Sequence, residues 1–245
     1  MLDGRHILVT GAARGLGAEI AGHLAGAGAR PILADIAEEV GRAAAEALQA
    51  PFLPVDLGDP ASIGALAEAI HEITGGRLGG LVNNGAIATG IGGVGFEEIE
   101  IDTWDRVMRV NVRGTWLMTR ACAPMLRADG AGRVVNVASD TALWGAPRLL
   151  SYVASKGAVI AMTRSLAREL GPDRIGVSAV APGILTTEST DYVPRARHQL
   201  YEEGRAVPGP QAAGEITETI AFLLGAGALA LTGQVLPVNN GFVFG

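Results

Sequence analysis

Short apolar runs alternate with amphipathic stretches over almost the whole chain. The apolar runs, which we expect to be strands, occupy residues 6–9, 31–34, 52–55, 81–82, 133–137, 176–181 and 234–238. Helical patterns occupy residues 16–28, 38–48, 61–73, 102–126, 152–170 and 213–224. Strands without a polar face are typical of a parallel sheet covered on both sides, and right-handed crossovers make such a sheet doubly wound. With no linker or internal repeat, we predict a single α/β domain over residues 1–245, a doubly wound (Rossmann) parallel sheet of about seven strands with helices on both faces.

Composition and charge narrow the classes of partner. The chain is 49% hydrophobic and 18% charged, which is typical of a globular protein. Its net charge of −6 and the lack of a basic stripe argue against nucleic acid as a partner. The single Cys122 excludes an internal disulfide and lies in an apolar helical pattern, so we expect a small core residue in a reducing compartment rather than a nucleophile. With no signal sequence, membrane-spanning run or predicted metal site, we expect a cytoplasmic protein.

Small or polar residues follow six of the predicted strands. Ligands of open α/β sheets bind outside the carboxyl ends of the strands, so these positions are the first candidates for a site. They are residues 11–17, Asp35, Asp56, residues 83–85, Ser139 and Pro182–Gly183. A set of six in succession is more than chance readily supplies, and it predicts a binding site along this edge.

The first of these positions is a glycine-rich turn, Thr-Gly-Ala-Ala-Arg-Gly-Leu-Gly at residues 10–17. Glycines allow a backbone to approach a pyrophosphate closely, and the helix that follows offers free N–H donors. The spacing is G-x-x-x-G-x-G rather than the usual dinucleotide fingerprint. The alternative is an ordinary glycine-rich turn between a strand and a helix.

Asp35 favours the cofactor interpretation. A carboxylate at the end of the second strand can accept hydrogen bonds from a ribose, and it repels a 2′-phosphate, so it favours NAD over NADP. Arg14 opposes this preference, since a cation in the glycine loop could reach a 2′-phosphate, but it can also turn into solvent. We therefore predict NAD, with NADP less favoured. Asp56 could accept from an adenine amino group or cap the helix that begins near Pro60.

Tyr152 and Lys156 are the candidates for proton transfer. They are four residues apart at the start of a helical pattern, so both side chains lie on one face of the helix. An ammonium close to a phenol favours the phenolate, lowers the phenol pKa and makes a general acid/base that is usable near neutral pH. The alternative is an accidental spacing, which is common on amphipathic helices.

Together these motifs resemble the short-chain dehydrogenases/reductases over essentially the whole chain. The resemblance is carried by an ordered set: Thr10-Gly-x-x-x-Gly-x-Gly17, Asp35, Asp56, Asn83-Asn84, Asn111, Ser139, Tyr152-x-x-x-Lys156 and Pro182-Gly183. It implies that Tyr152 is the general acid/base and that Lys156 holds the nicotinamide ribose and lowers the pKa of Tyr152. It also implies that Ser139 binds the substrate oxygen and that Asn111 holds a water in a proton relay.

The same resemblance implies a set of cofactor contacts. These are Gly11, Arg14, Gly15, Leu16, Gly17, Asp35, Asp56, Leu57, Asn84, Gly85, Tyr152, Lys156, Pro182, Gly183, Ile184 and Thr186. One departure stands out, because the family usually has Asn-Asn-Ala-Gly where this chain has Gly85-Ala86 in exchanged order. The methyl group of Ala86 disfavours a positive φ there, and we expect a small local adjustment.

The substrate has fewer signals in the sequence. Five residues follow Ser139 with side chains that suit an apolar pocket wall, and some of them are expected to line the pocket: Leu143, Trp144, Pro147, Leu149 and Leu150. Leu143 and Trp144 are the first candidates, together with Ser139 and Tyr152, and such a wall suits a hydrophobic or cyclic secondary alcohol or ketone, or an aldehyde. Residues 184–210 are long for a connection and are expected to form a substrate lid, the alternative being a disordered loop. Within this stretch, the spacing of Leu185, Tyr192, Leu200 and Tyr201 suits a short helical lid. Arg148 or Arg195 could meet a carboxylate or stay in solvent.

Two activities and one non-catalytic role compete on this fold. The first is an NAD-dependent alcohol dehydrogenase or carbonyl reductase, and the second is a 3-oxoacyl-carrier-protein reductase, which Asp35 and the acidic charge disfavour. The third is a dinucleotide-binding sensor, which the complete set of Asn, Ser, Tyr and Lys disfavours. Phe242 and Phe244 end the chain on apolar side chains, so we expect them at a subunit contact of a homotetramer, the assembly common in the family.

Overall fold

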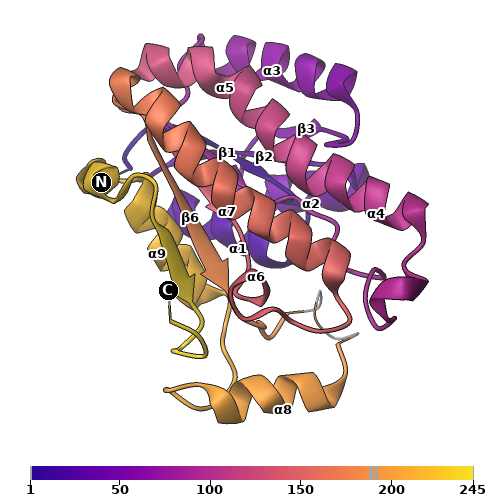
Figure 1. Ribbon diagram of the computed structural model, residues 1–245. Helices are drawn as coiled ribbons and strands as arrows, with labels where there is room; N and C mark the ends of the chain where they lie inside the picture. The colour runs from indigo at the N-terminus through magenta and orange to yellow at the C-terminus, as the bar shows by residue number, and fades with distance from the viewer. Residues whose placement is uncertain (1, 188–189, 191–192, 245) are drawn as a thin grey trace.

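A seven-stranded parallel sheet forms the centre of the computed structural model, which describes residues 2–187, 190 and 193–244 (Figure 1). The strands lie in the order β3-β2-β1-β4-β5-β6-β7, and every neighbouring pair is parallel. They are β1 His6–Thr10, β2 Arg30–Asp35, β3 Phe52–Pro54, β4 Gly80–Asn83, β5 Arg133–Val137, β6 Gly176–Pro182 and β7 Val235–Val238. The order reverses between β1 and β4, and this doubly wound arrangement confirms the predicted fold.

Helices cover both faces of the sheet (Figure 1). The α-helices are α1 Gly15–Gly26, α2 Glu38–Ala47, α3 Pro60–Thr74, α4 Ile101–Val107, α5 Thr115–Asp129, α6 Thr141–Trp144, α7 Leu150–Leu170, α8 Arg195–Gly204 and α9 Gly214–Leu224. A π-helical segment, η2 (Met108–Gly114), joins α4 to α5. Short 3-10 segments are η1 Phe96–Glu98, η3 Gly171–Asp173 and η5 Ala226–Leu231.

Among the described residues, two large hydrophobic cores lie on opposite sides of the sheet, and a smaller cluster lies between β6 and α7. Successive strand residues point to opposite faces, so Ile7 and Val9 of β1 pack on one side while Leu8 packs on the other. The first core is closed by α1, α2 and α9, and the second by α3, α5 and α7. Cys122 of α5 is buried in the second core, where burial raises its thiol pKa to about 12. This residue is therefore the core residue that the sequence predicted, in a protonated form unsuited to attack.

Three elements differ from the sequence-based expectation. The helix expected over residues 102–126 is a longer helical run in which the π-helical η2 interrupts α4 and α5. The short α6 directly follows β5 and was not predicted. The stretch 184–210 contains α8, which lies beyond the carboxyl ends of the strands at the bottom of Figure 1. Among its expected lid residues, Tyr192 lies outside the described residues.

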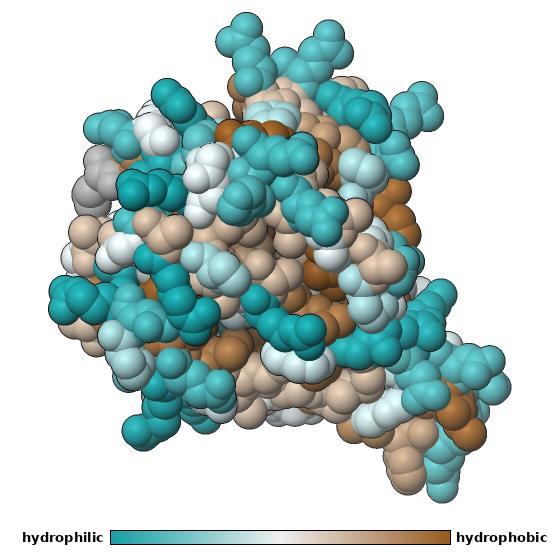
Figure 2. All heavy atoms as spheres, turned by 90° about the horizontal axis from the view of Figure 1, so that it is seen from above, coloured by the Kyte–Doolittle hydropathy of each residue, from teal (hydrophilic) through white to brown (hydrophobic). Residues whose placement is uncertain are grey.

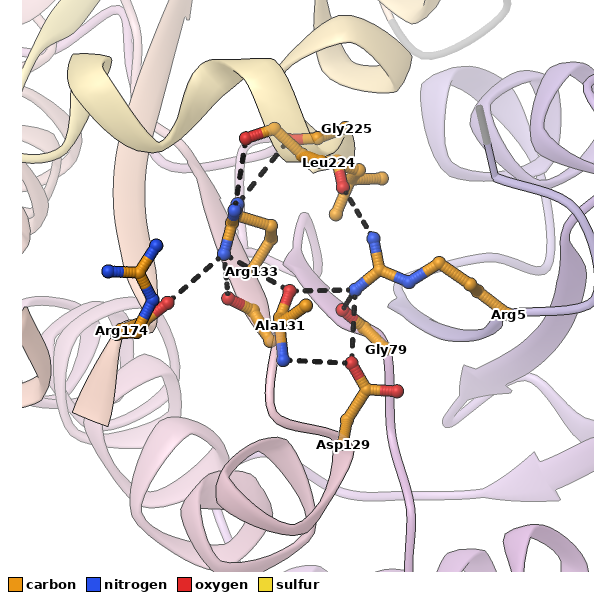
Figure 3. A network of polar contacts seen from close by, with 10 residues as sticks. Arg5, Gly79, Asp129, Ala131, Arg133, Arg174, Leu224 and Gly225 are labelled. Atoms are coloured by element: carbon orange, nitrogen blue, oxygen red, sulfur yellow. Dashed lines mark hydrogen bonds and ion pairs between the residues drawn. The ribbon is translucent and has the colours of Figure 1, made fainter.

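Two arginine side chains join neighbouring segments at the amino-terminal ends of the strands (Figure 3). Arg133 begins β5 and is 4% exposed, and it donates to the carbonyl oxygens of Ala131, Gly132, Arg174, Gly225 and Ala226. Arg5 precedes β1 and donates to the carbonyls of Gly79, Ala131 and Leu224 and to the Asp129 carboxylate. Because these ends are opposite the carboxyl ends of the strands, we interpret both arginines as structural.

Figure 2 shows the molecular surface at the end away from α8, where hydrophilic side chains lie around much of the outline. Apolar atoms show across the middle of this face and in patches at its rim. Within the described residues, no helix is both long enough and apolar enough to cross a membrane.

Candidate active site

A cleft of about 430 Å³ opens at the carboxyl ends of the central strands, and residues of α8 form part of its wall. It is lined by most of the residues that the sequence singled out: Gly11, Arg14, Leu16, Gly17, Asp35, Asn84, Gly85, Ser139, Tyr152, Lys156, Pro182, Gly183 and Ile184. A second hollow of about 410 Å³ adjoins it, shares Gly11, Asp35 and Gly85, and adds Asp56 and Leu57. The fold thus gathers strand ends that are far apart in the sequence into one continuous site.

Lys156 and Tyr152 project from the first turns of α7. The Lys156 side chain is buried, its Nζ donates to the Val137 carbonyl over 2.6 Å, and Nζ lies 5.6 Å from the centroid of the Tyr152 ring. Burial lowers the pKa of Lys156 to about 8. The ammonium is therefore held in place at the base of the cleft, next to the candidate proton donor.

Ser139 lies opposite, directly after β5. It is buried at the wall of the cleft, and its Oγ accepts hydrogen bonds from the backbone N–H and the hydroxyl of Thr141. Ser139, Tyr152 and Lys156 therefore line one cavity, as a site for a hydroxyl or carbonyl oxygen requires.

Asn111 lies in η2, where the π-helical turn carries its side chain toward α7. Its amide donates to the Ile87 carbonyl and to Ser155 Oγ, and its oxygen accepts from the Ile87 N–H over 2.7 Å. Asn111 thus connects the chain after β4 to the residue that precedes Lys156. The proton relay through Asn111 remains a prediction.

The glycine turn is built to bring backbone close to a ligand. Gly11 has a φ of +65°, and a Cβ at Gly17 would overlap the Gly11 carbonyl oxygen. Asn84 fixes the turn, because its amide donates to the carbonyls of Thr10 and Gly11. The Thr10 hydroxyl in turn accepts from the N–H groups of Asn84 and Gly85.

The exchanged pair Gly85-Ala86 also has a structural reason. A Cβ at Gly85 would lie 2.7 Å from the end of the Leu57 side chain and 3.1 Å from the Gly11 backbone nitrogen, so glycine relieves a close approach where this segment passes the turn. Ala86 lines both hollows. The departure from the usual family order therefore belongs with the packing of Gly85 against the glycine turn.

Asp35 lines both hollows, and its carboxylate also shapes the loop. One oxygen accepts from the Ala13 N–H over 3.0 Å and the other from the Ala37 N–H over 2.9 Å. Each carboxylate oxygen can accept more than one hydrogen bond, so these contacts leave capacity for ribose hydroxyls. Gly15, which begins α1 with a φ of +55°, lets the chain enter the helix directly after Arg14.

The capping alternative for Asp56 is wrong. The helix cap of α3 is Asp59, whose Oδ1 accepts from the Ala61 N–H, whereas Asp56 Oδ1 accepts from the Gly58 N–H. The turn that follows Asp56 needs three residues before α3 can begin, which puts the cap later in the chain. Asp56 lies instead in the second hollow, together with Arg106 and Arg109, which sequence reasoning did not consider.

Three expected contact residues lie elsewhere. Leu143 lines a different hollow beside Arg164 and Gln234, and Trp144 lies behind Tyr201, to whose hydroxyl its Nε1 donates over 3.1 Å. Thr186 is exposed and donates its backbone N–H to the Gln211 carbonyl, while its neighbour Thr187 lines the cleft. The reason is local: α6 turns the chain after Ser139 and directs Leu143 and Trp144 outward from the cleft.

Other residues form the wall near Ser139 and Tyr152. They are Asp140, Leu149, Leu185, Val193, Arg197 and Tyr201. From the sequence, Leu149 was a candidate for the pocket wall, and Leu185 and Tyr201 were expected in a short helical lid. Asp140, Val193 and Arg197 were not assigned to the site, because no motif distinguishes them.

Asp140 and Tyr201 form the polar centre of this wall. The Tyr201 hydroxyl donates to Asp140 Oδ1 over 2.7 Å, and Asn239 Nδ2 donates to Asp140 Oδ2 over 3.2 Å. Asp140 is 0% exposed, and burial raises its pKa to about 6 against the opposing effect of these two hydrogen bonds. Burial also raises the pKa of Tyr201 above its usual range, so Tyr201 remains the donor.

Phe242 completes this cluster from within the same chain. Its ring stacks on Tyr201 at a centroid distance of 4.0 Å and meets Trp144 edge to face. Phe242 is thus half-buried within its own chain, against α8 and α6, and its place at a subunit contact stays a prediction. Phe244 is 83% exposed.

Comparison with known proteins gives four results. A family model described as enoyl-(acyl carrier protein) reductase matches residues 11–243. The 3-alpha-(or 20-beta)-hydroxysteroid dehydrogenase of Mycobacterium tuberculosis is 33% identical over 246 residues, which cover 100% of this chain and 91% of that protein. The cyclopentanol dehydrogenase of Comamonas testosteroni is 34% identical over 248 residues, which cover 96% of each. The crystal structure of a 3-ketoacyl-(acyl-carrier-protein) reductase from Brucella melitensis complexed with NADH is similar with a TM-score of 0.92 and 31% identity, over 100% of both chains.

Proposed function

Because this chain belongs to the short-chain dehydrogenase/reductase family, we propose that it interconverts a hydrophobic or cyclic secondary alcohol and its ketone, or an alcohol and its aldehyde, with NAD(H). One observation carries this proposal: Ser139, Tyr152 and Lys156 line the same cleft as the glycine turn. The set combines a proton donor, an oxygen ligand and a cofactor cradle.

The cradle fits a dinucleotide, because the close packing of Gly11, Gly17 and Gly85 leaves backbone where side chains would otherwise stand. Gly11 and Gly17 would hold the pyrophosphate, Asp35 the adenosine ribose, and Lys156 the nicotinamide ribose. When bound there, the nicotinamide supplies or accepts the hydride.

The proton steps belong to the chain itself. In the oxidation direction, the Tyr152 phenolate removes the proton from the substrate hydroxyl, while Ser139 holds the oxygen by a hydrogen bond. The positive charge of Lys156 stabilises the phenolate. Reduction runs the same proton transfer backwards, from the Tyr152 hydroxyl to the forming alkoxide.

The choice of NAD over NADP is supported by Asp35. Its carboxylate is fixed by two backbone N–H groups at the end of β2, and a 2′-phosphate placed there would meet this charge. Ile36 follows it with an exposed apolar side chain, which offers no countercharge. Arg14 lines the cleft and opposes the preference. We expect a higher kcat/KM with NAD⁺ than with NADP⁺ in a side-by-side assay; the reverse ratio would remove this role from Asp35.

A 3-oxoacyl-carrier-protein reductase is the second candidate, because the structural relative from Brucella melitensis has that activity in its description. The two candidates are separated by a substrate panel. Cyclic secondary alcohols with NAD⁺ should give NADH, whereas an acetoacetyl thioester with NADH or NADPH should react slowly. A thioester preferred over every cyclic alcohol would favour the second candidate.

The assembly and location are proposals as well. A homotetramer is supported by exposed apolar side chains, among them Trp116 on α5, Phe222 on α9 and the terminal Phe244. Light scattering that gives a monomer would contradict it. The single buried Cys122 supports a cytoplasmic location.

A further inference from the structure

The helix α8 is fixed over the substrate end of the cleft. Tyr201 is 2% exposed, and its hydroxyl is bonded to Asp140, the residue after Ser139. Its ring is stacked on Phe242 from the carboxyl-terminal segment. Side chains on the same face of α8 are therefore held at defined positions relative to Ser139.

Arg197 lies one helical turn before Tyr201 and lines the same cleft. Its guanidinium is anchored at two points: Nη2 donates to the Pro147 carbonyl over 3.2 Å, and Cζ lies 5.6 Å from the centroid of the Trp144 ring. The side chain is half-buried. An arginine in this position has lost part of its rotamer freedom but still has N–H donors to offer.

The other charges that line the cleft already have functions or partners. Arg14 and Asp35 belong to the cofactor end, Lys156 is bonded at its base, and both oxygens of Asp140 accept hydrogen bonds. Across residues 2–187, 190 and 193–244, the ion pairs found do not involve Arg197. A fixed cation therefore stands at the substrate end.

The surroundings of Arg197 limit the ligand. Leu149, Leu185 and Val193 line the same end of the cleft and would contact an apolar ring or chain. A guanidinium binds a carboxylate through two parallel hydrogen bonds. A single cation balances one negative charge, so a carboxylate fits better than a doubly charged phosphate.

We propose that Arg197 is a specificity-determining residue that binds a carboxylate on the substrate, so that the preferred substrates are hydroxy acids or oxo acids with an apolar ring or chain. This rests on the proposed function, because it assumes that the alcohol or carbonyl group lies at Ser139 and Tyr152. The carboxylate would orient the substrate, while the reacting carbon stays at Tyr152.

A matched pair of substrates tests the charge directly. The substrates are 4-hydroxycyclohexanecarboxylate and its methyl ester, assayed with NAD⁺ and the full-length protein. We expect wild-type kcat/KM to favour the acid. In Arg197→Met, kcat/KM for the acid should fall about 10- to 100-fold, mainly through KM, while the value for the ester changes less than about 3-fold. Arg197→Lys should recover part of the loss.

Arg195→Met is the control variant, because Arg195 is on the same helix but exposed. In this variant, kcat/KM for the acid and for the ester should both equal the wild-type values. Equal losses on acid and ester in Arg197→Met, or a wild-type preference for the ester, would overturn the proposal. Similar thermal unfolding of the three proteins excludes a folding defect.

A binding measurement separates the failure of this inference from that of the proposed function. Calorimetry with cyclohexanecarboxylate in the presence of NADH should show binding to wild type and Arg195→Met, and at least tenfold weaker binding to Arg197→Met. If no alcohol is turned over but wild type still binds the acid more tightly than Arg197→Met, the proposed reaction is rejected and the carboxylate site at Arg197 is kept. If alcohols are turned over but wild type and Arg197→Met bind the acid equally, the anion site is wrong.

Discussion

At the scale of single residues, burial distinguishes Lys156 from ordinary lysines. The side chain is enclosed, bonded to the Val137 carbonyl and close to the Tyr152 ring, and its pKa is lowered to about 8. It therefore loses its charge at a lower pH than a surface lysine does. In the proposed function, this one residue serves both cofactor binding and the proton chemistry of Tyr152.

Replacements of these two residues should have different signatures. Tyr152→Phe removes the proton donor, so kcat should fall by roughly 10²- to 10⁴-fold with an unchanged Kd for NADH. Lys156→Met removes the charge that serves both the phenolate and the ribose, so kcat should fall and the Kd for NADH should rise. Steady-state kinetics with fluorescence titration of NADH measures both. Substantial turnover in Tyr152→Phe would remove that residue from its role.

Asp140 gives a prediction on pH and stability. Its folded pKa of about 6 lies above the usual value for an unfolded aspartate of about 3.9, so the folded state holds the proton more tightly. This stabilisation is fully present below about pH 4 and is lost as the pH rises to about 6. Relative to Asp140→Asn, the wild-type free energy of unfolding should decrease over this window by up to roughly 3 kcal/mol.

Urea unfolding of both proteins at several pH values between 4 and 7 measures this difference. The comparison of the two proteins cancels the titration of all other groups. A difference that stays constant across the window would show that Asp140 titrates normally in the folded protein.

At the scale of elements, the junction of β1 and α1 forms the proposed cofactor cradle. Gly11 has a positive φ, and Gly17 lies so close to the Gly11 carbonyl that no side chain fits between them. Asn84 and Thr10 hold the turn in this shape from the end of β4 and the end of β1. The binding surface is therefore backbone whose conformation two neighbouring strands impose.

Gly17→Ala should abolish or greatly weaken NADH binding, because the new methyl group forces the turn apart. Gly26→Ala is the matched control on the same helix, since a Cβ there meets nothing within 4 Å. The control should keep NADH binding and gain up to about 1 kcal/mol of stability from helix propensity. Fluorescence titration and thermal unfolding report the two effects. Normal NADH affinity in Gly17→Ala would refute the cradle.

The helix α8 has a similar dependence on distant segments. Its position relies on Asp140 after β5 and on Phe242 near the end of the chain. The substrate end of the cleft is thus formed by three segments that meet only in the folded chain.

At the scale of the whole molecule, the two ends of the parallel strands differ in what they carry. The cleft lies at the carboxyl ends, and Arg5 and Arg133 join neighbouring segments at the amino-terminal ends (Figure 3). Arg133 is buried and bonded to carbonyls of the chain before β5, the chain before β6 and the segment after α9. Replacement of this residue should therefore affect stability and leave the chemistry intact.

Arg133→Met should lower the free energy of unfolding by roughly 3 kcal/mol or more, because buried carbonyls lose their donors. The control is Arg127→Met, which breaks an exposed ion pair with Asp173 and should cost at most about 1 kcal/mol. At temperatures where both variants are folded, kcat/KM should equal the wild-type value. A stable Arg133→Met variant with altered kinetics would contradict the assignment.

The sequence by itself determined the seven strands, the doubly wound sheet and the residues at the strand ends. A strand that is buried on both faces is a continuous apolar run, which can be recognised from a few neighbouring residues. The turns that follow such strands need glycine or polar residues. The spacing of Tyr152 and Lys156 follows from helix geometry alone. These features depend on neighbours within a few residues, which is why the pattern is sufficient to find them.

Only the tertiary structure decided which side chains form the substrate end. Tyr201 and Asn239 reach Asp140 across sequence separations of 61 and 99 residues. The packing of α8 also brought Arg197 to the cleft. The physical reason is that a short helix within a long connection takes its position from the residues it packs against, and for α8 those partners come from distant parts of the chain.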